Sequence, residues 1–165
     1  MLTQQIILGL DPGLADTGWG IIVKDQSLRL VACGSLKTAS GQPLDLRLAE
    51  LRRQLLEILE LYQPQLVAIE ELFFNTNTTT AIAVAEARGV LLATIGEQKL
   101  AWLEFTPLEI KQALTTSGRA AKPQVGRMVM KLLKLTALPK PDDAVDALAC
   151  AICASFQSPL IKAYV

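Results

Sequence analysis

The sequence predicts an α/β fold in which a mixed five-stranded sheet is flanked by helices. Three observations predict it: β-rich runs open the chain, strand and helix patterns then alternate, and the apolar content suits one core. At 165 residues, 51% of them hydrophobic, the chain has the size of one globular domain. We expect that domain over residues 1–158, followed by a short C-terminal tail over 159–165.

The first 38 residues predict a three-stranded antiparallel meander. QIILGLD (5–11), GWGIIVK (18–24) and LRLVACGSLKT (28–38) are β-rich runs separated by turn residues. Two short apolar runs, LVAIEE (66–71) and AWLEF (101–105), predict the fourth and fifth strands.

Helical patterns occupy the intervals that follow. Leucines at three- and four-residue spacing predict a helix from Leu44 to Tyr62, which Pro64 ends. An Ala-rich stretch over 78–97 predicts a second helix, interrupted at Gly89. Three further helices are expected over 107–116, 123–135 and 142–156.

The composition narrows the chemistry. Histidine is absent, which excludes Ser-His and Cys-His nucleophile systems and the usual nitrogen ligand of zinc. Cys150 and Cys153 form a C-x-x-C pair, but their apolar surroundings indicate small core residues. Three cysteines, with neither a secretory signal nor a membrane span, predict a cytoplasmic protein without membrane contacts.

Four carboxylates form the candidate site. Asp11 ends the first strand and Glu70 the fourth, and open α/β sheets bind ligands at these carboxyl ends. Asp143 and Asp146 share one face of the last helix, whereas Asp142 is expected to cap its N-terminus. Like charges 4 Å apart cost about 4 kcal/mol per pair at an effective dielectric near 20. Such a cluster therefore requires protons or a hard divalent cation such as Mg²⁺ or Mn²⁺.

Each acid also has a purely structural interpretation. Asp11 suits a turn, Glu70 suits a solvated strand end, and acids in a first helical turn interact favourably with the helix dipole. Because both Asp11 and Glu70 directly follow a buried apolar run, the set as a whole favours a binding site.

Four stretches resemble the motif regions of the RuvC family of bacterial Holliday-junction resolvases. They are ILGLDPGLADTGWGII, LVAIEELFFNTNTTTAIAVAEARGV, IKQALTTSGRAAKPQV and KPDDAVDALACAI, in order along nearly the whole chain. The resemblance implies an RNase H-like fold with helices on both sheet faces. It also implies a homodimer that makes paired, magnesium-dependent nicks in four-way DNA junctions during recombination and repair, together with a branch-migration motor.

The resemblance also assigns roles by position. Asp11, Glu70, Asp143 and Asp146 correspond to the catalytic acids that bind two Mg²⁺ ions, for which Mn²⁺ substitutes. The implied chemistry is two-metal hydrolysis of a phosphodiester without a covalent intermediate.

Basic residues are concentrated near the C-terminal half although the formal net charge is zero. Seven lie between residues 110 and 141 without an acid: Lys111, Arg119, Lys122, Arg127, Lys131, Lys134 and Lys140. Lys111 and Lys122 match family lysines that contact the scissile strand, and both are expected to stabilise the charge of the transition state. Arg119 is a further expected DNA contact, whereas Lys131 and Lys134 also suit solvated helix faces.

The segment FFNTNTTT (73–80) predicts further DNA contacts. The resemblance favours Phe73 for stacking on an unpaired base, with Phe74 in packing and Asn77 binding phosphate. A core position beside a helix cap is the alternative.

The small residues Ala81, Ala85 and Gly89 suit either core packing or a dimer seam, and we expect part of this face in the seam, by analogy with the family.

Other functions remain open at this level. LDPGLADTGWG also resembles the first phosphate loop of the actin and sugar-kinase superfamily, although that machinery needs two such domains. An RNase H-like ribonuclease acting on ribosomal RNA precursor and a non-catalytic junction-binding protein share the same expected fold. Substrate choice separates these alternatives.

Overall fold

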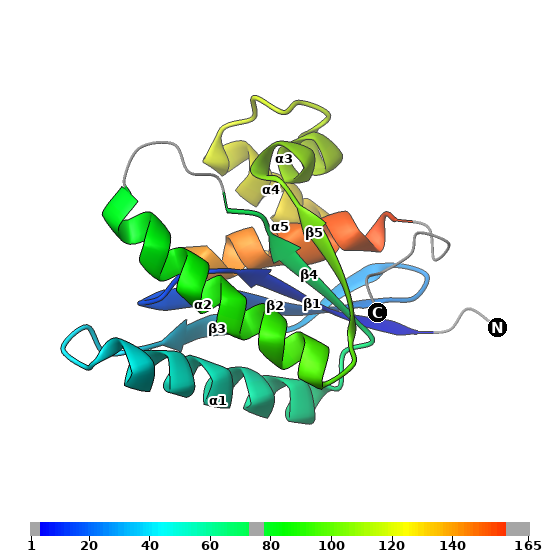
Figure 1. The fold of residues 1–165 in the computed structure, drawn as a ribbon. Coiled ribbons are helices and arrows are strands. Elements are labelled where there is room, and N and C mark those ends of the chain that lie inside the picture. Colours follow the sequence, from blue (N-terminus) through cyan, green and yellow to red (C-terminus); the bar gives the residue numbers. More distant parts are fainter. Residues whose placement is uncertain (1–3, 73–77, 158–165) are drawn as a thin grey trace.

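The computed structural model describes residues 4–72 and 78–157, and its strands form one sheet in the order β3-β2-β1-β4-β5 (Figure 1). The strands are β1 (Gln5–Asp11), β2 (Asp16–Lys24), β3 (Leu28–Lys37), β4 (Leu66–Glu70) and β5 (Ala101–Phe105). The first three pair antiparallel as a meander, whereas β4 and β5 run parallel to β1. The predicted mixed five-stranded sheet is confirmed.

Helices cover both faces of this sheet (Figure 1). They are α1 (Leu44–Tyr62), α2 (Thr78–Glu97), α3 (Pro107–Thr115), α4 (Lys122–Leu132) and α5 (Asp142–Ser155). Successive strand residues point to opposite faces, so Leu8 belongs to the core beneath α1 and α2, and Ile7 to the core beneath α3, α4 and α5. The expectation of helices on both faces is confirmed.

Three predicted boundaries were wrong. The helix α4 ends at Leu132 rather than 135, because Lys134 adopts a left-handed φ of 55° and the Leu135 N–H donates to the Met130 carbonyl. The helix α2 continues through Gly89, since one glycine in a helix interior costs only about 1 kcal/mol relative to alanine. The strand β2 begins at Asp16 rather than at Gly18, so Gly18 lies within the strand instead of at its start.

The N-terminus of α5 lacks the side-chain cap predicted for it, whereas a lysine side chain caps its C-terminus. Pro141 occupies the N-cap position without a side-chain capping bond, and Asp142 is the first helical residue, so its predicted capping role was wrong. Its carboxylate lies instead in the first turn, where the helix dipole favours negative charge. At the other end, the Lys24 ammonium of β2 donates to the Ser155 carbonyl and satisfies a terminal acceptor of the helix.

The interior of α5 is almost entirely buried. Cys150 and Cys153 are free thiols within it, which confirms their predicted role as small core residues. Within the described residues, no helix combines the length and apolarity needed to cross a bilayer.

Candidate active site

Asp11 and Glu70 are the last residues of two neighbouring parallel strands. Leu10 of β1 pairs with Ile69 of β4, so the acid that follows each of them leaves the sheet at the same edge. Both side chains are only partly accessible. A rigid sheet thus presents two carboxylates side by side at its carboxyl edge.

The helix α5 adds two more carboxylates because it lies very close to the strands β1 and β2. An ideal Cβ on Gly18 would be 2.1 Å from the Asp143 carbonyl oxygen, and one on Gly9 would be 1.9 Å from that of Ala147. No side chain fits at either position. As a result, carboxylate oxygens of Asp11, Asp143 and Asp146 all lie within 4.8 Å of one another.

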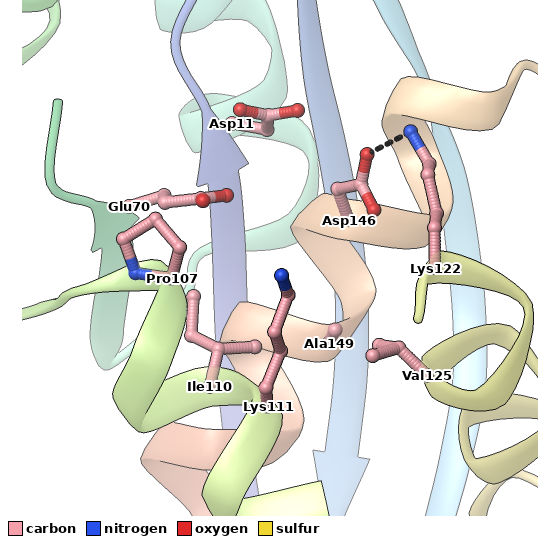
Figure 2. A pocket seen from close by; sticks show the side chains of 9 residues that line it. All are labelled: Asp11, Glu70, Pro107, Ile110, Lys111, Lys122, Val125, Asp146 and Ala149. Atoms are coloured by element: carbon pink, nitrogen blue, oxygen red, sulfur yellow. Dashed lines mark hydrogen bonds and ion pairs between the residues drawn. The ribbon is translucent and has the colours of Figure 1, made fainter. Parts of the chain in front are cut away.

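Asp11, Glu70 and Asp146 border a pocket of about 240 Å³ (Figure 2). Its lining comprises three acids, two lysines and four apolar residues: Asp11, Glu70, Asp146, Lys111, Lys122, Pro107, Ile110, Val125 and Ala149. In Figure 2 the Lys111 ammonium points from α3 toward the space between Glu70 and Asp146. The pocket therefore combines an acidic rim, two cations and a dry apolar wall.

Local capping fixes the helix that carries Lys111. The Thr106 hydroxyl accepts from the Glu109 N–H at 3.2 Å, and the Glu109 carboxylate accepts from the Thr106 N–H at 2.8 Å. Pro107 occupies the first helical turn, where its missing N–H is tolerated. This capping box starts α3 directly after β5 and sets the direction in which Lys111 leaves the helix.

Burial and neighbouring carboxylates raise the pKa values of two of the acids, Asp11 and Glu70. Burial, followed by the negative charges of Glu70, Asp146 and Asp143, raises the pKa of Asp11 from 3.8 to about 8. Burial and the charge of Asp146 raise the pKa of Glu70 from 4.5 to about 7. The protein alone therefore does not keep every acid ionised near neutral pH. Buried carboxylate oxygens in this arrangement fit a hard divalent cation such as Mg²⁺ or Mn²⁺.

Lys122 contacts the acidic cluster directly. Its ammonium donates to the Asp146 carboxylate at 2.6 Å, and this hydrogen bond raises the pKa of the lysine. The residue opens α4, so a short, fixed segment of chain carries it to the pocket. A permanent positive charge accordingly lies at the edge of the acidic rim.

The remaining predicted site residues lie elsewhere. Arg119 is exposed in the turn between α3 and α4 and is not among the residues that line the pocket. Phe73, Phe74 and Asn77 lie outside the described residues. On α2, Ala85 and Gly89 are exposed and Ala81 is half-buried, so this face is not part of the core.

Comparison with known proteins decides the family. The model of the family described as crossover junction endodeoxyribonuclease RuvC matches residues 7–154. This chain belongs to the RuvC family. It is 50% identical over 155 residues to the RuvC of Rubrobacter xylanophilus, covering 93% of this chain and 87% of that protein. The resemblance inferred from the four motifs is therefore confirmed.

Solved structures of the RuvC family share the architecture. The Thermus thermophilus RuvC structure superposes with a TM-score of 0.87 at 32% identity, covering 96% of this chain and 98% of that one. The same protein in complex with Holliday junction substrate gives a TM-score of 0.86 at 32% identity, over 92% and 93% of the two chains. The RNase H-like type of fold expected for a RuvC protein is thereby confirmed.

Two groups of site residues escaped the sequence reasoning. Pro107, Ile110, Val125 and Ala149 form the apolar wall, and apolar residues in helices carry no signal that separates a pocket wall from a core. Gly18 was predicted as the first residue of a strand without a role in the site, but a glycine within a strand marks the close approach of another backbone. That signal was present in the sequence.

Proposed function

We propose that this chain is a metal-dependent endonuclease that resolves four-way DNA junctions by paired nicks. Its membership of the RuvC family supports this activity. The observation that carries it is the convergence of Asp11, Asp143 and Asp146 within 4.8 Å at the edge of a lysine-bearing pocket.

The four acids would hold the metal, for which we propose two Mg²⁺ ions. Asp11, Asp143 and Asp146 would form one set of ligands, and Asp11 and Glu70 would form the other, so Asp11 would belong to both sets. A bound divalent ion supplies Lewis acidity and positive charge toward a phosphodiester. Burial, followed by repulsion from the neighbouring carboxylates, raises the pKa values of Asp11 and Glu70, and a bound cation would offset the cost of keeping both ionised.

The lysines of the pocket would act on the substrate itself. Lys111 and Lys122 offer ammonium groups beside the carboxylates, where a scissile phosphate has to lie. A fixed cation next to a developing negative charge stabilises the transition state more than the ground state. Lys122, held by Asp146, is our candidate for this role.

Sequence-independent affinity for DNA would come from the basic segment between residues 110 and 141. This segment forms most of α3, all of α4 and their connections on the α5 side of the sheet (Figure 1), and its Lys111 and Lys122 line the pocket. Exposed cations such as Arg119 suit contacts with phosphates. Stacking by Phe73 and phosphate binding by Asn77 stay predictions, as do a branch-migration motor partner and a cytoplasmic location.

Two symmetric nicks need two sites related by a two-fold axis, so we propose a homodimer. The exposed face of α2 supports this proposal, because small residues follow one another along it: Ala85, Gly89, Ala93 and Gly96. A Cβ added to Gly89 would meet no atom within 4 Å. A second copy could therefore approach this face closely.

The test uses a labelled synthetic four-way junction and a linear duplex of the same sequence. We expect paired nicks in the junction with Mg²⁺, no nicks with EDTA, and junction binding without cleavage in Ca²⁺. Asp11→Asn should still bind the junction. Its cleavage rate should fall by at least about 10³-fold, since a ligand to the cation is lost. Equal binding and cleavage of the linear duplex would contradict the proposal.

The same assay separates the alternatives. Cleavage of an RNA substrate in preference to the junction would favour the ribonuclease interpretation. Tight junction binding by the wild-type chain without cleavage in Mg²⁺ or Mn²⁺ would favour a non-catalytic junction-binding protein.

A further inference from the structure

Gly18 lies directly opposite Asp11 in the antiparallel ladder between β1 and β2. Paired residues of an antiparallel ladder point to the same face of the sheet, so any side chain at position 18 would lie beside the Asp11 carboxylate. The Asp143 backbone occupies that space, with its carbonyl oxygen 2.1 Å and its carbonyl carbon 2.5 Å from an ideal Cβ. The absence of a side chain at Gly18 therefore lets the Asp143 backbone approach Asp11.

Gly9 repeats this arrangement one turn further along α5. An ideal Cβ there would lie 1.9 Å from the carbonyl oxygen of Ala147, the residue that directly follows Asp146. The closest obstructing atoms at both positions are backbone atoms, which do not rotate away as a side-chain end does. A methyl group at either site would displace the helix by roughly 1 Å, since interiors pack to near-crystalline density.

A displacement of this size is large compared with the tolerance of a metal site. Two oxygens bound to one Mg²⁺ at 2.0–2.1 Å are at most about 4.2 Å apart, whereas Ca²⁺ with longer, more flexible bonds accepts about 5.2 Å. The oxygens of Asp11, Asp143 and Asp146 lie within 4.8 Å of one another. A further 1 Å would allow separations of about 5.8 Å, beyond what either ion can bridge.

We propose that Gly18 and Gly9 are positioning residues that set the separation of the clustered carboxylates and thereby allow one divalent cation to bind them together. They touch neither metal nor DNA, and act only by letting the α5 backbone rest on the strands. This inference rests on the proposed function, because it takes the carboxylates as cation ligands.

Gly20 provides a matched control in the same strand and under the same helix. An ideal Cβ at Gly20 would meet the Leu148 side chain at 2.5 and 2.6 Å, and the nearest backbone atom at 3.4 Å. The end of a leucine side chain can rotate to relieve this contact. Gly20→Ala is therefore expected to lower stability without moving the α5 backbone or the acids near its N-terminus.

The experiment measures binding of Mg²⁺ and Ca²⁺ by isothermal titration calorimetry on the full chain without DNA. The variants are Gly18→Ala, Gly9→Ala and Gly20→Ala, each checked for folding by circular dichroism and thermal melting. We expect Gly18→Ala to lower Mg²⁺ affinity about 10- to 100-fold, the range found when supporting contacts of metal ligands are lost. Ca²⁺ affinity should fall as well, and Gly20→Ala should retain both affinities within about twofold.

Gly9→Ala repeats the test should Gly18→Ala not fold. A folded Gly18→Ala or Gly9→Ala chain with wild-type affinity for both Mg²⁺ and Ca²⁺ would overturn the inference. Failure of both variants to fold, while Gly20→Ala folds, would also overturn it, because the close approach would then serve folding alone. If the wild-type chain bound neither ion, the proposed metal site itself would be wrong, which is a different result.

Discussion

The two faces of the sheet are covered by helices in different ways. Beneath α1 and α2, fully buried side chains such as Leu51, Leu55 and Leu91 fill the space between helix and strand. Beneath α5, Gly9 and Gly18 remove the side chains, so the helix backbone rests on the strands. One face is a conventional hydrophobic layer, and the other has a helix pressed against the sheet.

Because of this difference, one face mainly contributes to the stability of the fold, and the other mainly fixes the positions of the site residues. A layer of leucines tolerates small shifts of α1 and α2, because flexible side chains adjust to them. Contacts between rigid backbones tolerate almost none. The carboxylates of Asp143 and Asp146 therefore lie on the face where position is held most tightly, and we expect substitutions on the two faces to have different consequences.

The largest effect on stability is expected on the leucine face. Leu55 is fully buried, so Leu55→Ala should lower the free energy of unfolding by about 2–5 kcal/mol, through lost apolar burial and the cavity left behind. Urea denaturation measures this. The folded variant should retain its Mg²⁺ affinity. Leu61→Ala, on the same helix but 71% exposed, is the control and should change stability by less than about 0.5 kcal/mol. Lost metal affinity in folded Leu55→Ala would contradict the division between the faces.

The pocket face should instead show a loss in rate. Lys122→Ala is expected to lower the cleavage rate constant about 10²-fold, because a cation beside the reacting phosphate is removed, while junction affinity changes little. Single-turnover kinetics and a gel-shift titration in Ca²⁺ measure the two quantities. Lys131→Ala, exposed on the same helix, is the control. Proportionate losses of rate and affinity would assign Lys122 to DNA binding alone.

The acidic cluster should make stability depend on pH when divalent ions are absent. The folded-state pKa of Asp11, about 8, lies above its ordinary value of 3.8, so the folded chain binds this proton more tightly than the unfolded chain. Stability from this group is complete below pH 4 and is lost as the pH rises through 8. Glu70, with a pKa of about 7, acts in the same direction.

In EDTA, Tm should therefore fall between pH 6 and pH 9, by about 5 °C if roughly 2 kcal/mol is lost. Mg²⁺ should restore it at the higher pH, and Asp11→Asn should flatten the profile. Scanning calorimetry across this range measures the effect. A Tm that rises with pH in EDTA, after correction for Asp11→Asn, would show that the carboxylates do not repel one another as proposed.

The smallest effect on the fold is expected at the exposed face of α2. Gly89→Arg adds a side chain into open space, so the free energy of unfolding of a single chain should change by no more than about 1 kcal/mol. If this face forms the dimer seam, the same change should convert the dimer into a monomer in sedimentation velocity. Gly89→Ala is the control. A dimer that persists in Gly89→Arg would place the seam elsewhere.

Most of the fold follows from local patterns in the chain. Alternation and β-rich composition place the strands, and leucine spacing places α1 from Leu44 to Tyr62, because these signals depend on neighbours within one or two turns. The helix ends that were predicted wrongly depend on backbone conformation rather than on residue spacing. The left-handed Lys134 ends α4 early, and Pro141 takes the cap position expected for Asp142.

The candidate site also has one part that follows from local sequence patterns and one part that does not. The sequence by itself determined that Asp11 and Glu70 end strands and that Asp143 and Asp146 share a helix face, since both depend on short-range periodicity. Only the tertiary structure decided that α5 rests on Gly9 and Gly18, which brings Asp143 and Asp146 to Asp11. Contact between backbones more than 120 residues apart depends on the packing of the whole sheet, and periodicity does not report it.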